Sequence, residues 1–349
     1  MFFMFVLSVK RDFAVQNYNI FWKHASLEHF FHKKCEKFAY VQFLLYLCSR
    51  KGFEARIMAK IGIFDSGYGG LTILDAIRKE IPQYDYLYLG DNARAPYGTH
   101  SFDVIYRYTL QAVNYLFEQG CALVILACNT ASAKALRTIQ QNNIPPLREG
   151  LGRPINVLGV IRPTVEAVPA ITKTGHVGIL ATPATVSSES YVLELEKIAS
   201  GLTITQQACP MWVPLIEAGE HNEPGAKYFI GKYLRELLAK DPQIDTIVLG
   251  CTHYPLMKAK IDEWLEFRHE LEESEFPMPV ETPLVTTIAQ GELEAKSLAD
   301  YLQRHPEYRD QLSTGGTCTY LTTENADRFS QSASIFLSSP VQAEHIDLE

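Results

Sequence analysis

Two of the seven cysteines stand at the ends of short apolar runs and precede small polar residues. Cys128 follows residues 123–127 and precedes Asn-Thr, while Cys251 follows residues 246–250 and precedes Thr-His. If each run is a strand that leads into a helix, donors at the helix N-terminus can lower the thiol pKa from about 8.5. Such a thiol serves as a base or an acid near neutral pH, and the same donors suit a bound carboxylate.

Two further strand ends carry polar residues in the same order along the chain. Asp65-Ser66 follows the apolar residues 61–64, and Thr182 follows residues 177–180. In open parallel sheets, ligands bind beyond the carboxyl ends of the strands. We therefore expect Asp65 and Thr182 to lie at ligand-binding edges, as the two cysteines do.

Strands that alternate with helices predict an α/β fold with parallel sheets covered by helices. Residues 84–89 read as a further strand, 102–119 and 284–302 as helices, and 318–337 as a strand and a helix. The recurrence of the strand–Cys unit predicts two α/β domains of related design. We expect residues 59–155 with about 275–340 to form the first, and 156–274 the second. Residues 269–279, acidic and Pro-containing, read as a solvated loop.

The composition excludes several classes of protein. Hydrophobic residues make up 47% of the 349 residues and charged residues 21%, which excludes bulk disorder. The net charge of −8 disfavours general nucleic-acid binding. The cysteines form no CxxC pair, so a zinc ribbon is not expected, and no metal site is predicted. Unpaired thiols in a reducing compartment are the favoured interpretation.

The first 57 residues differ from the rest. They hold nine Lys or Arg against four Asp or Glu, and 14 of the 39 aromatic residues. Their longest apolar run, 38–48, is too short to span a bilayer. We interpret residues 1–58 as a poorly ordered extension or an over-long gene start. A helix on a membrane surface is the alternative.

A dinucleotide site is the first competing reading. Gly67 and Gly69 follow a strand and open a helix, and Asp91 lies where a ribose-binding acid would stand. However, Thr72 occupies the third glycine position, and Asp65 would face an anionic pyrophosphate. We therefore disfavour a nicotinamide cofactor.

Each remaining candidate also has a purely structural interpretation. Asp65 could serve as a helix cap and nothing more, and Tyr97-Gly98 could simply form a turn. Glu217 could be a solvated helix residue, and His253 could satisfy a local hydrogen bond. A buried cysteine is most often a small core residue. That is how we interpret Cys121, Cys209 and Cys318.

Five strings nevertheless occur together in one order: IGIFDSGYGGLT, LGDNARAPYG, ILACNTASA, VPLIEAGE and LGCTHYPLM. Over residues 59–337 the chain resembles the glutamate racemases, amino-acid racemases that need no cofactor and have two α/β domains facing across a cleft. The resemblance implies that Cys128 and Cys251 are acid/base residues, that Asp65 assists Cys128, and that Glu217 and His253 assist Cys251. The implied substrate site comprises Asp65, Ser66, Tyr97, Gly98, Asn129, Thr130, Thr252 and His253.

Two opposed thiols suit this chemistry. Inverting a stereocentre by proton exchange needs a base on one face of Cα and an acid on the other, and one residue cannot occupy both faces. A repeated domain pair supplies one group from each side. Without pyridoxal phosphate, preorganised donors in a water-poor cleft must stabilise the carbanion.

The resemblance also carries expectations about biology. It implies a cytoplasmic homodimer that binds glutamate, with no nucleic acid and no membrane, and supplies D-glutamate for peptidoglycan, cell-wall biogenesis and cell shape. Aspartate racemase and an inactive binding or regulatory module are the alternatives. The chain departs from the family pattern in residues 1–58, in the long 145–156 connection and around 269–279.

Overall fold

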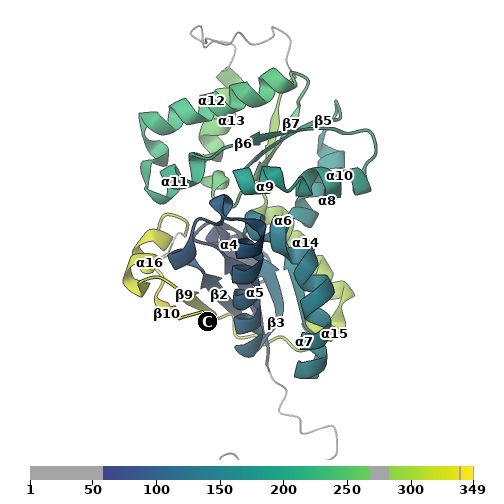
Figure 1. Ribbon diagram of the computed structural model, residues 1–349, viewed down its shortest axis with the longest axis vertical. Coiled ribbons are helices and arrows are strands. Elements are labelled where there is room, and N and C mark those ends of the chain that lie inside the picture. Colours follow the sequence, from purple (N-terminus) through teal and green to yellow (C-terminus); the bar gives the residue numbers. More distant parts are fainter. Residues whose placement is uncertain (1–57, 268–282, 338, 349) are drawn as a thin grey trace, which may run out of the picture. The chain divides into compact units, whose positions relative to one another are not determined.

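Two parallel sheets organise the chain in the computed structural model, which describes residues 58–267, 283–337 and 339–348 (Figure 1). The predictions for residues 1–57 and for the 269–279 loop lie outside these ranges. The first sheet has the strand order β10-β9-β2-β1-β3-β4, and the second has β6-β5-β7-β8. All the strand pairs within them are parallel.

The strands have the following bounds. The first sheet contains β1 (Lys60–Asp65), β2 (Tyr86–Gly90), β3 (Cys121–Leu126), β4 (Asn156–Gly159), β9 (Cys318–Thr322) and β10 (Ala343–His345). The second sheet contains β5 (His176–Ala181), β6 (Thr203–Ala208), β7 (Thr246–Gly250) and β8 (Thr286–Ile288).

Helices connect the strands. The longer ones are α4 (Gly70–Glu80), α5 (Phe102–Glu118), α6 (Asn129–Thr138), α7 (Ile144–Leu151), α8 (Ile161–Ile171), α10 (Ser190–Ile198), α12 (Pro224–Lys240), α13 (Lys258–Phe267), α14 (Gly291–Arg304) and α16 (Ala326–Ala333). The short ones are α9 (Pro183–Ser187), α11 (Trp212–Glu217) and α15 (Pro306–Arg309). None of the described helices is long and apolar enough to cross a bilayer.

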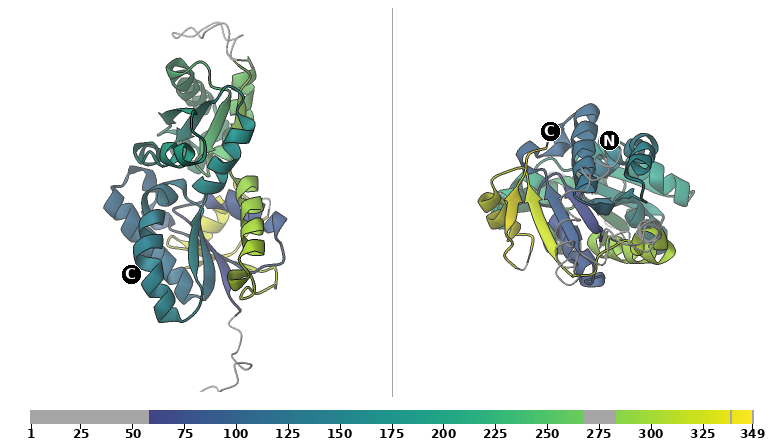
Figure 2. Two further views of the ribbon diagram at one scale, coloured as in Figure 1. Left: turned by 90° about the vertical axis from the view of Figure 1, so that its right-hand side faces the viewer. Right: turned by 90° about the horizontal axis from the view of Figure 1, so that it is seen from below.

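The apolar strands are buried because helices cover both faces of each sheet. On one side of the first sheet, Ile61 and Ile63 pack with residues of α4 and α14. On the other side, Phe64 packs with residues of α5 and α6. Figure 2 shows blue α5 and yellow-green α14 on opposite sides of this sheet. The second sheet likewise has a cluster on each face.

The predicted repeat is present in the topology. The order β2-β1-β3-β4 in the first sheet corresponds to β6-β5-β7-β8 in the second. Strand β1 thus corresponds to β5, and β3 to β7, as the recurring sequence units indicate. This confirms the predicted fold class, two α/β regions with mostly parallel sheets flanked by helices.

Three details differ from the sequence prediction. The predicted helix over 284–302 begins only at Gly291, because Thr286–Ile288 pairs with β7 as strand β8. That strand lies after residue 275 yet belongs to the second sheet, while β4 lies after residue 155 yet belongs to the first. The chain therefore crosses between the sheets after β4 and again after β8. Strand β10 was not predicted.

Candidate active site

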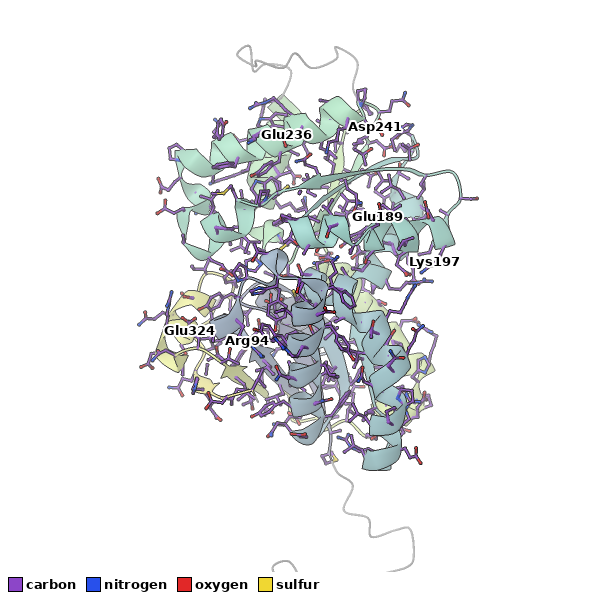
Figure 3. All side chains as sticks on the ribbon, viewed as in Figure 1. Arg94, Glu189, Lys197, Glu236, Asp241 and Glu324 are labelled. Carbon is purple, nitrogen blue, oxygen red and sulfur yellow. The ribbon has the colours of Figure 1, made fainter. Side chains whose placement is uncertain are left out.

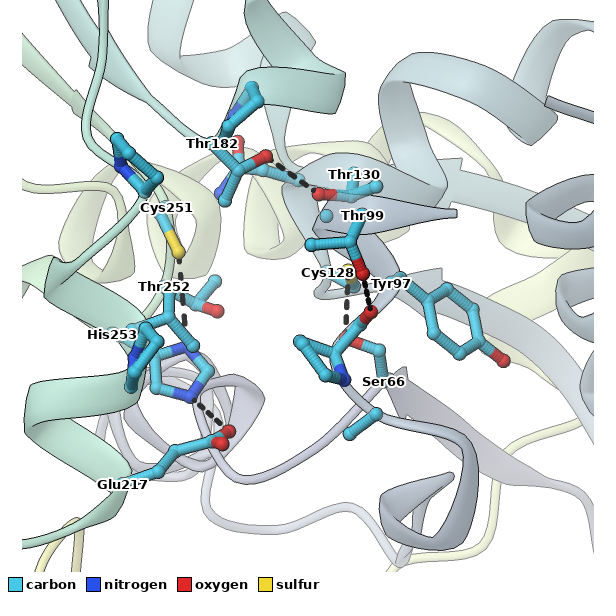
Figure 4. A pocket seen from close by; sticks show the side chains of 18 of the residues that line it. Ser66, Tyr97, Thr99, Cys128, Thr130, Thr182, Glu217, Cys251, Thr252 and His253 are labelled. Carbon is cyan, nitrogen blue, oxygen red and sulfur yellow. Dashed lines mark hydrogen bonds and ion pairs between the residues drawn. The ribbon is translucent and has the colours of Figure 1, made fainter. Parts of the chain in front are cut away.

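The polar strand ends of both sheets line one cavity of about 90 Å³ (Figure 4). Every predicted site residue lies in its wall: Asp65, Ser66, Tyr97, Gly98, Cys128, Asn129, Thr130, Glu217, Cys251, Thr252 and His253. Cys128 comes from the first sheet, where it precedes α6, and Cys251 directly follows β7 of the second. The cavity thus receives a thiol from equivalent strand ends of the two halves, after β3 and after β7.

Cys128 caps the N-terminus of α6. Its sulfur accepts a hydrogen bond from the Ala131 N–H at 3.4 Å and lies 3.2 Å from Oγ of Ser66. Burial, and secondly the negative charge of Asp65, raise the pKa of this thiol to about 12, although both hydrogen bonds oppose the shift. The helix end does lower the pKa, as expected, through the Ala131 N–H, but burial raises it by more.

Asp65 ends β1 beside this thiol. Its Oδ2 accepts a hydrogen bond from the Gly67 N–H at 2.9 Å, and its buried Oδ1 has no hydrogen-bond partner among the described residues. Burial raises the pKa of Asp65, while His253 acts in the opposite direction. A buried oxygen with a free lone pair is suited to receive a donor from a ligand.

Cys251 has a cationic neighbour. Its sulfur lies 3.8 Å from Nδ1 of His253, and Nε2 of the same ring lies 3.0 Å from Oε1 of Glu217 (Figure 4). Burial lowers the pKa of His253, but the hydrogen bonds to Cys251 and Glu217 outweigh it and raise the pKa to about 10. The two thiols therefore have electrostatically opposite surroundings, since Cys128 faces Asp65.

The glycines of the 65–70 loop allow the two halves to meet. A Cβ on Gly69 would overlap Nδ1 of His253 and lie 2.7 Å from its Cε1. A Cβ on Gly70 would lie 2.5 Å from Cβ of Asp65, and one on Gly67 would lie 3.2 Å from Oε1 of Glu217. The contacts at Gly69 and Gly70 are too short for a side chain, and the contact at Gly67 is tight, so the glycines serve close packing around His253, Asp65 and Glu217.

Asp91 is held by protein side chains, which counts against the dinucleotide alternative. It is buried, and its carboxylate accepts hydrogen bonds from Arg94, Tyr97 and Thr323. Figure 3 labels Arg94, whose Nε donates to Asp91. Tyr97 lines the cavity, but its hydroxyl proton is donated to Asp91 and is not available to a ligand.

Thr182 lies beside Thr130 in the cavity wall. Their hydroxyl oxygens lie 3.0 Å apart, and a Cβ on Gly98 would lie 3.2 Å from Cβ of Thr182. Thr182 follows β5 as Asp65 ends β1, so the repeat identified this position from the sequence. Sequence reasoning missed the remaining lining residues, Ala95, Pro96, Thr99, Pro183, Cys209, Pro210, Val213 and Pro214. Within the described ranges, no three His, Cys, Asp or Glu side chains group as a metal site.

Comparisons with known proteins agree on one family. The family model Asp/Glu/Hydantoin racemase matches residues 71–269. A glutamate racemase of Ruegeria sp. is 42% identical over 287 residues, which cover 79% of this chain and 96% of that protein.

Solved structures resemble the fold as well. A Francisella tularensis glutamate racemase in complex with D-glutamate has a TM-score of 0.67 at 28% identity, covering 84% of this chain and 99% of that one. A Thermus thermophilus glutamate racemase in complex with β-chloro-D-alanine has a TM-score of 0.64 at 30% identity, covering 84% and 98%. With its repeated sheets and its paired thiols in one cavity, the chain belongs to the Asp/Glu/hydantoin racemase family.

Proposed function

We propose that this protein interconverts L-glutamate and D-glutamate without a cofactor, using Cys128 and Cys251 as its two acid/base residues. The observation that carries the proposal is that equivalent ends of two repeated sheets each supply a thiol to one cavity. The relatives named as glutamate racemases support glutamate as the substrate.

The reaction exchanges one proton for another. One cysteine, as thiolate, takes the Cα proton, and the electron pair of the broken C–H bond remains on the substrate as a carbanion. The second cysteine, as thiol, gives its proton to the opposite face of Cα, which inverts the configuration. The first cysteine ends as a thiol and the second as a thiolate, so the reverse reaction uses them with exchanged roles.

The neighbours of each thiol fit this exchange. The buried carboxyl group of Asp65 lies beside Cys128 and assists it, while His253 and Glu217 assist Cys251. In this proposal Cys251 removes the proton of L-glutamate and Cys128 that of D-glutamate. A charged imidazole next to Cys251 would stabilise the thiolate that accepts the proton.

The substrate carries two carboxylates and an ammonium group. We assign Oδ1 of Asp65, which has no hydrogen-bond partner within the described ranges, to the ammonium group, because it is a buried acceptor in the cavity wall. The carboxylates would contact N–H and hydroxyl donors of Ser66, Asn129, Thr130 and Thr252, and the backbone at Tyr97-Gly98. Fixed donors of this kind stabilise charge on the substrate in the transition state.

The physiological part of the proposal follows from the substrate. We propose that the enzyme supplies D-glutamate for peptidoglycan precursors in the cytoplasm, and that it acts as a homodimer. Size-exclusion chromatography with light scattering tests the dimer, and complementation of a D-glutamate-requiring bacterial strain tests the supply role.

Solvent exchange tests the activity directly. The protein is incubated in D₂O with L-glutamate or L-aspartate, without pyridoxal phosphate, and deuterium at Cα is measured by proton NMR together with the optical rotation. Deuterium incorporation with glutamate and not aspartate supports the proposal. Incorporation with aspartate alone makes the protein an aspartate racemase, and incorporation with neither makes it a binding module.

A further inference from the structure

A buried glutamine outside the cavity wall contacts one of the predicted substrate-binding residues. Gln290 lies between β8 and α14 and is 1% exposed. Its Nε2 lies 3.2 Å from the Val160 carbonyl oxygen, 3.0 Å from Oγ1 of Thr164 and 3.0 Å from the Tyr191 hydroxyl. It also lies 3.1 Å from Oδ1 of Asn129, whose Nδ2 lies 2.6 Å from Oε1 of Gln290.

The backbone fixes which way the Gln290 amide points. A carbonyl oxygen only accepts hydrogen bonds, so the Gln290 atom 3.2 Å from the Val160 carbonyl must be nitrogen. The other atom is then Oε1, and the Asn129 atom 2.6 Å from it must be a donor, Nδ2. Oδ1 of Asn129 therefore faces Tyr191, whose hydroxyl donates to it at 2.8 Å.

This orientation decides what Asn129 offers to the cavity that it lines. Its Oδ1 accepts from the Tyr191 hydroxyl and lies 3.1 Å from Nε2 of Gln290, and one of its two Nδ2 protons goes to Gln290. The second N–H has no hydrogen-bond partner among the described residues and is the group left for a ligand in the cavity that Asn129 lines. A reversed amide would instead turn a carbonyl oxygen toward the cavity and repel a carboxylate.

We propose that Gln290 is a positioning residue that holds the Asn129 amide as a hydrogen-bond donor for a substrate carboxylate. The inference rests on the proposed amino-acid substrate. It means that a residue from the second half of the fold orients a substrate-binding residue of the first half. Gln290 follows β8 of the second sheet, and Asn129 begins α6 after β3 of the first.

The direct test is Gln290→Met, which keeps the length of the side chain and removes its polar atoms. We expect the KM for glutamate to rise by about 10-fold or more, with a smaller change in kcat, because the carboxylate loses an oriented donor. Tyr191→Phe removes one donor to Asn129 and is expected to raise KM in the same direction by a smaller factor. An unchanged KM in both variants overturns the proposal.

A double-mutant cycle separates positioning from a general structural effect. If Gln290 acts through Asn129, adding Gln290→Met to Asn129→Ala changes KM by less than about 2-fold. Fully additive effects would overturn the inference. Thr164→Val is the matched control, since Thr164 contacts Gln290 but not Asn129 and lies outside the cavity wall. Its KM is expected to equal that of the unmodified protein.

A measurement that needs no turnover keeps this inference distinct from the proposed function. In protein labelled with ¹⁵N-asparagine, hydrogen exchange of the Asn129 side-chain amide is followed by NMR. We expect exchange at least about 100-fold slower than in an exposed side-chain amide, and faster exchange in Gln290→Met. Rapid exchange in the unmodified protein contradicts the inference, whereas inactivity toward glutamate contradicts only the proposed function.

Discussion

Glu217 accepts a hydrogen bond from His253, with 3.0 Å between Oε1 and Nε2. The opposite ring nitrogen, Nδ1, lies 3.8 Å from the sulfur of Cys251. A histidine donates from both nitrogens only when it is protonated, and the pKa of about 10 agrees with a charged ring at neutral pH. The ring therefore links a carboxylate that is partly exposed to a thiol that is buried.

Glu217→Gln tests this link through stability. The pKa of His253 is about 10 in the fold against 6.5 as the reference, so its charge stabilises the fold fully below pH 6.5. That contribution is lost as pH rises toward 10. Without the Glu217 carboxylate the pKa of His253 in the folded state falls. The variant should therefore lose on the order of 1–3 kcal/mol of stability at pH 6.5. Urea unfolding at pH 6.5, 8 and 10 measures it.

The control for this experiment is Glu223→Gln, an exposed residue before α12. It should unfold as the unmodified protein does at each pH. The difference between Glu217→Gln and the unmodified protein should shrink between pH 6.5 and 10. A difference that stays constant over this range would show that Glu217 does not act through the charge of His253.

Parallel-sheet geometry explains why the sequence predicted so much of the site. Ligands bind beyond the carboxyl ends of parallel strands, so the sequence places both Asp65 and Cys128 at a ligand-binding edge. Only the family resemblance implies that the two act together. The same reasoning placed Cys251 in the second sheet. The repeat of the strand–Cys unit then predicted that two such edges exist, and the matching strand orders confirm two sheets of related design.

Contacts between distant segments explain what the sequence did not reveal. The pKa of Cys128 depends on burial and on Asp65, neither of which is visible in the residues around the thiol. Gln290 is 161 residues from Asn129 and carries no local motif. The sequence predicts helix at Thr286–Ile288, because three residues are too few to show the alternation of a strand. Pairing with β7 decides the conformation of this segment.

Gly69→Ala should impair catalysis more than folding. The added methyl group would overlap Nδ1 of His253 and Oγ1 of Thr252, so the imidazole must move away from its contact with Cys251. We expect kcat/KM for glutamate to fall by about 10-fold or more. Gly150→Ala, in helix α7 with nothing within 4 Å of the added Cβ, is the matched control and should retain activity. Steady-state kinetics at saturating and low glutamate compare the two, and equal activities would argue against this close packing.

Replacing either thiol should stop the proton exchange while leaving the fold intact. A serine hydroxyl is a far weaker acid than a thiol, so Cys128→Ser and Cys251→Ser should each lower kcat by about 10²–10⁴-fold. Circular dichroism should remain that of the unmodified protein. Cys318→Ser, at the start of β9 and outside the cavity, is the control and should keep its activity. Full turnover in either of the first two variants would rule out the two-cysteine mechanism.

Glu294 should make the protein less stable as pH rises through neutrality. The side chain is 2% exposed, its Oε2 has no hydrogen-bond partner within the described ranges, and burial raises its pKa from 4.5 to about 7. Between these values the folded state holds a proton that the unfolded state has lost, so the free energy of unfolding falls with pH.

Glu294→Gln removes this ionisation and keeps the shape of the protonated acid. The variant should match the unmodified protein near pH 4.5 and exceed it by on the order of 2–3 kcal/mol at pH 8, as judged by urea unfolding. Glu292→Gln, an exposed position in the same first turn of α14, should show no such gap. If Glu294→Gln follows the unmodified protein at every pH, the carboxyl is solvated in the native state and its burial does not disfavour ionisation.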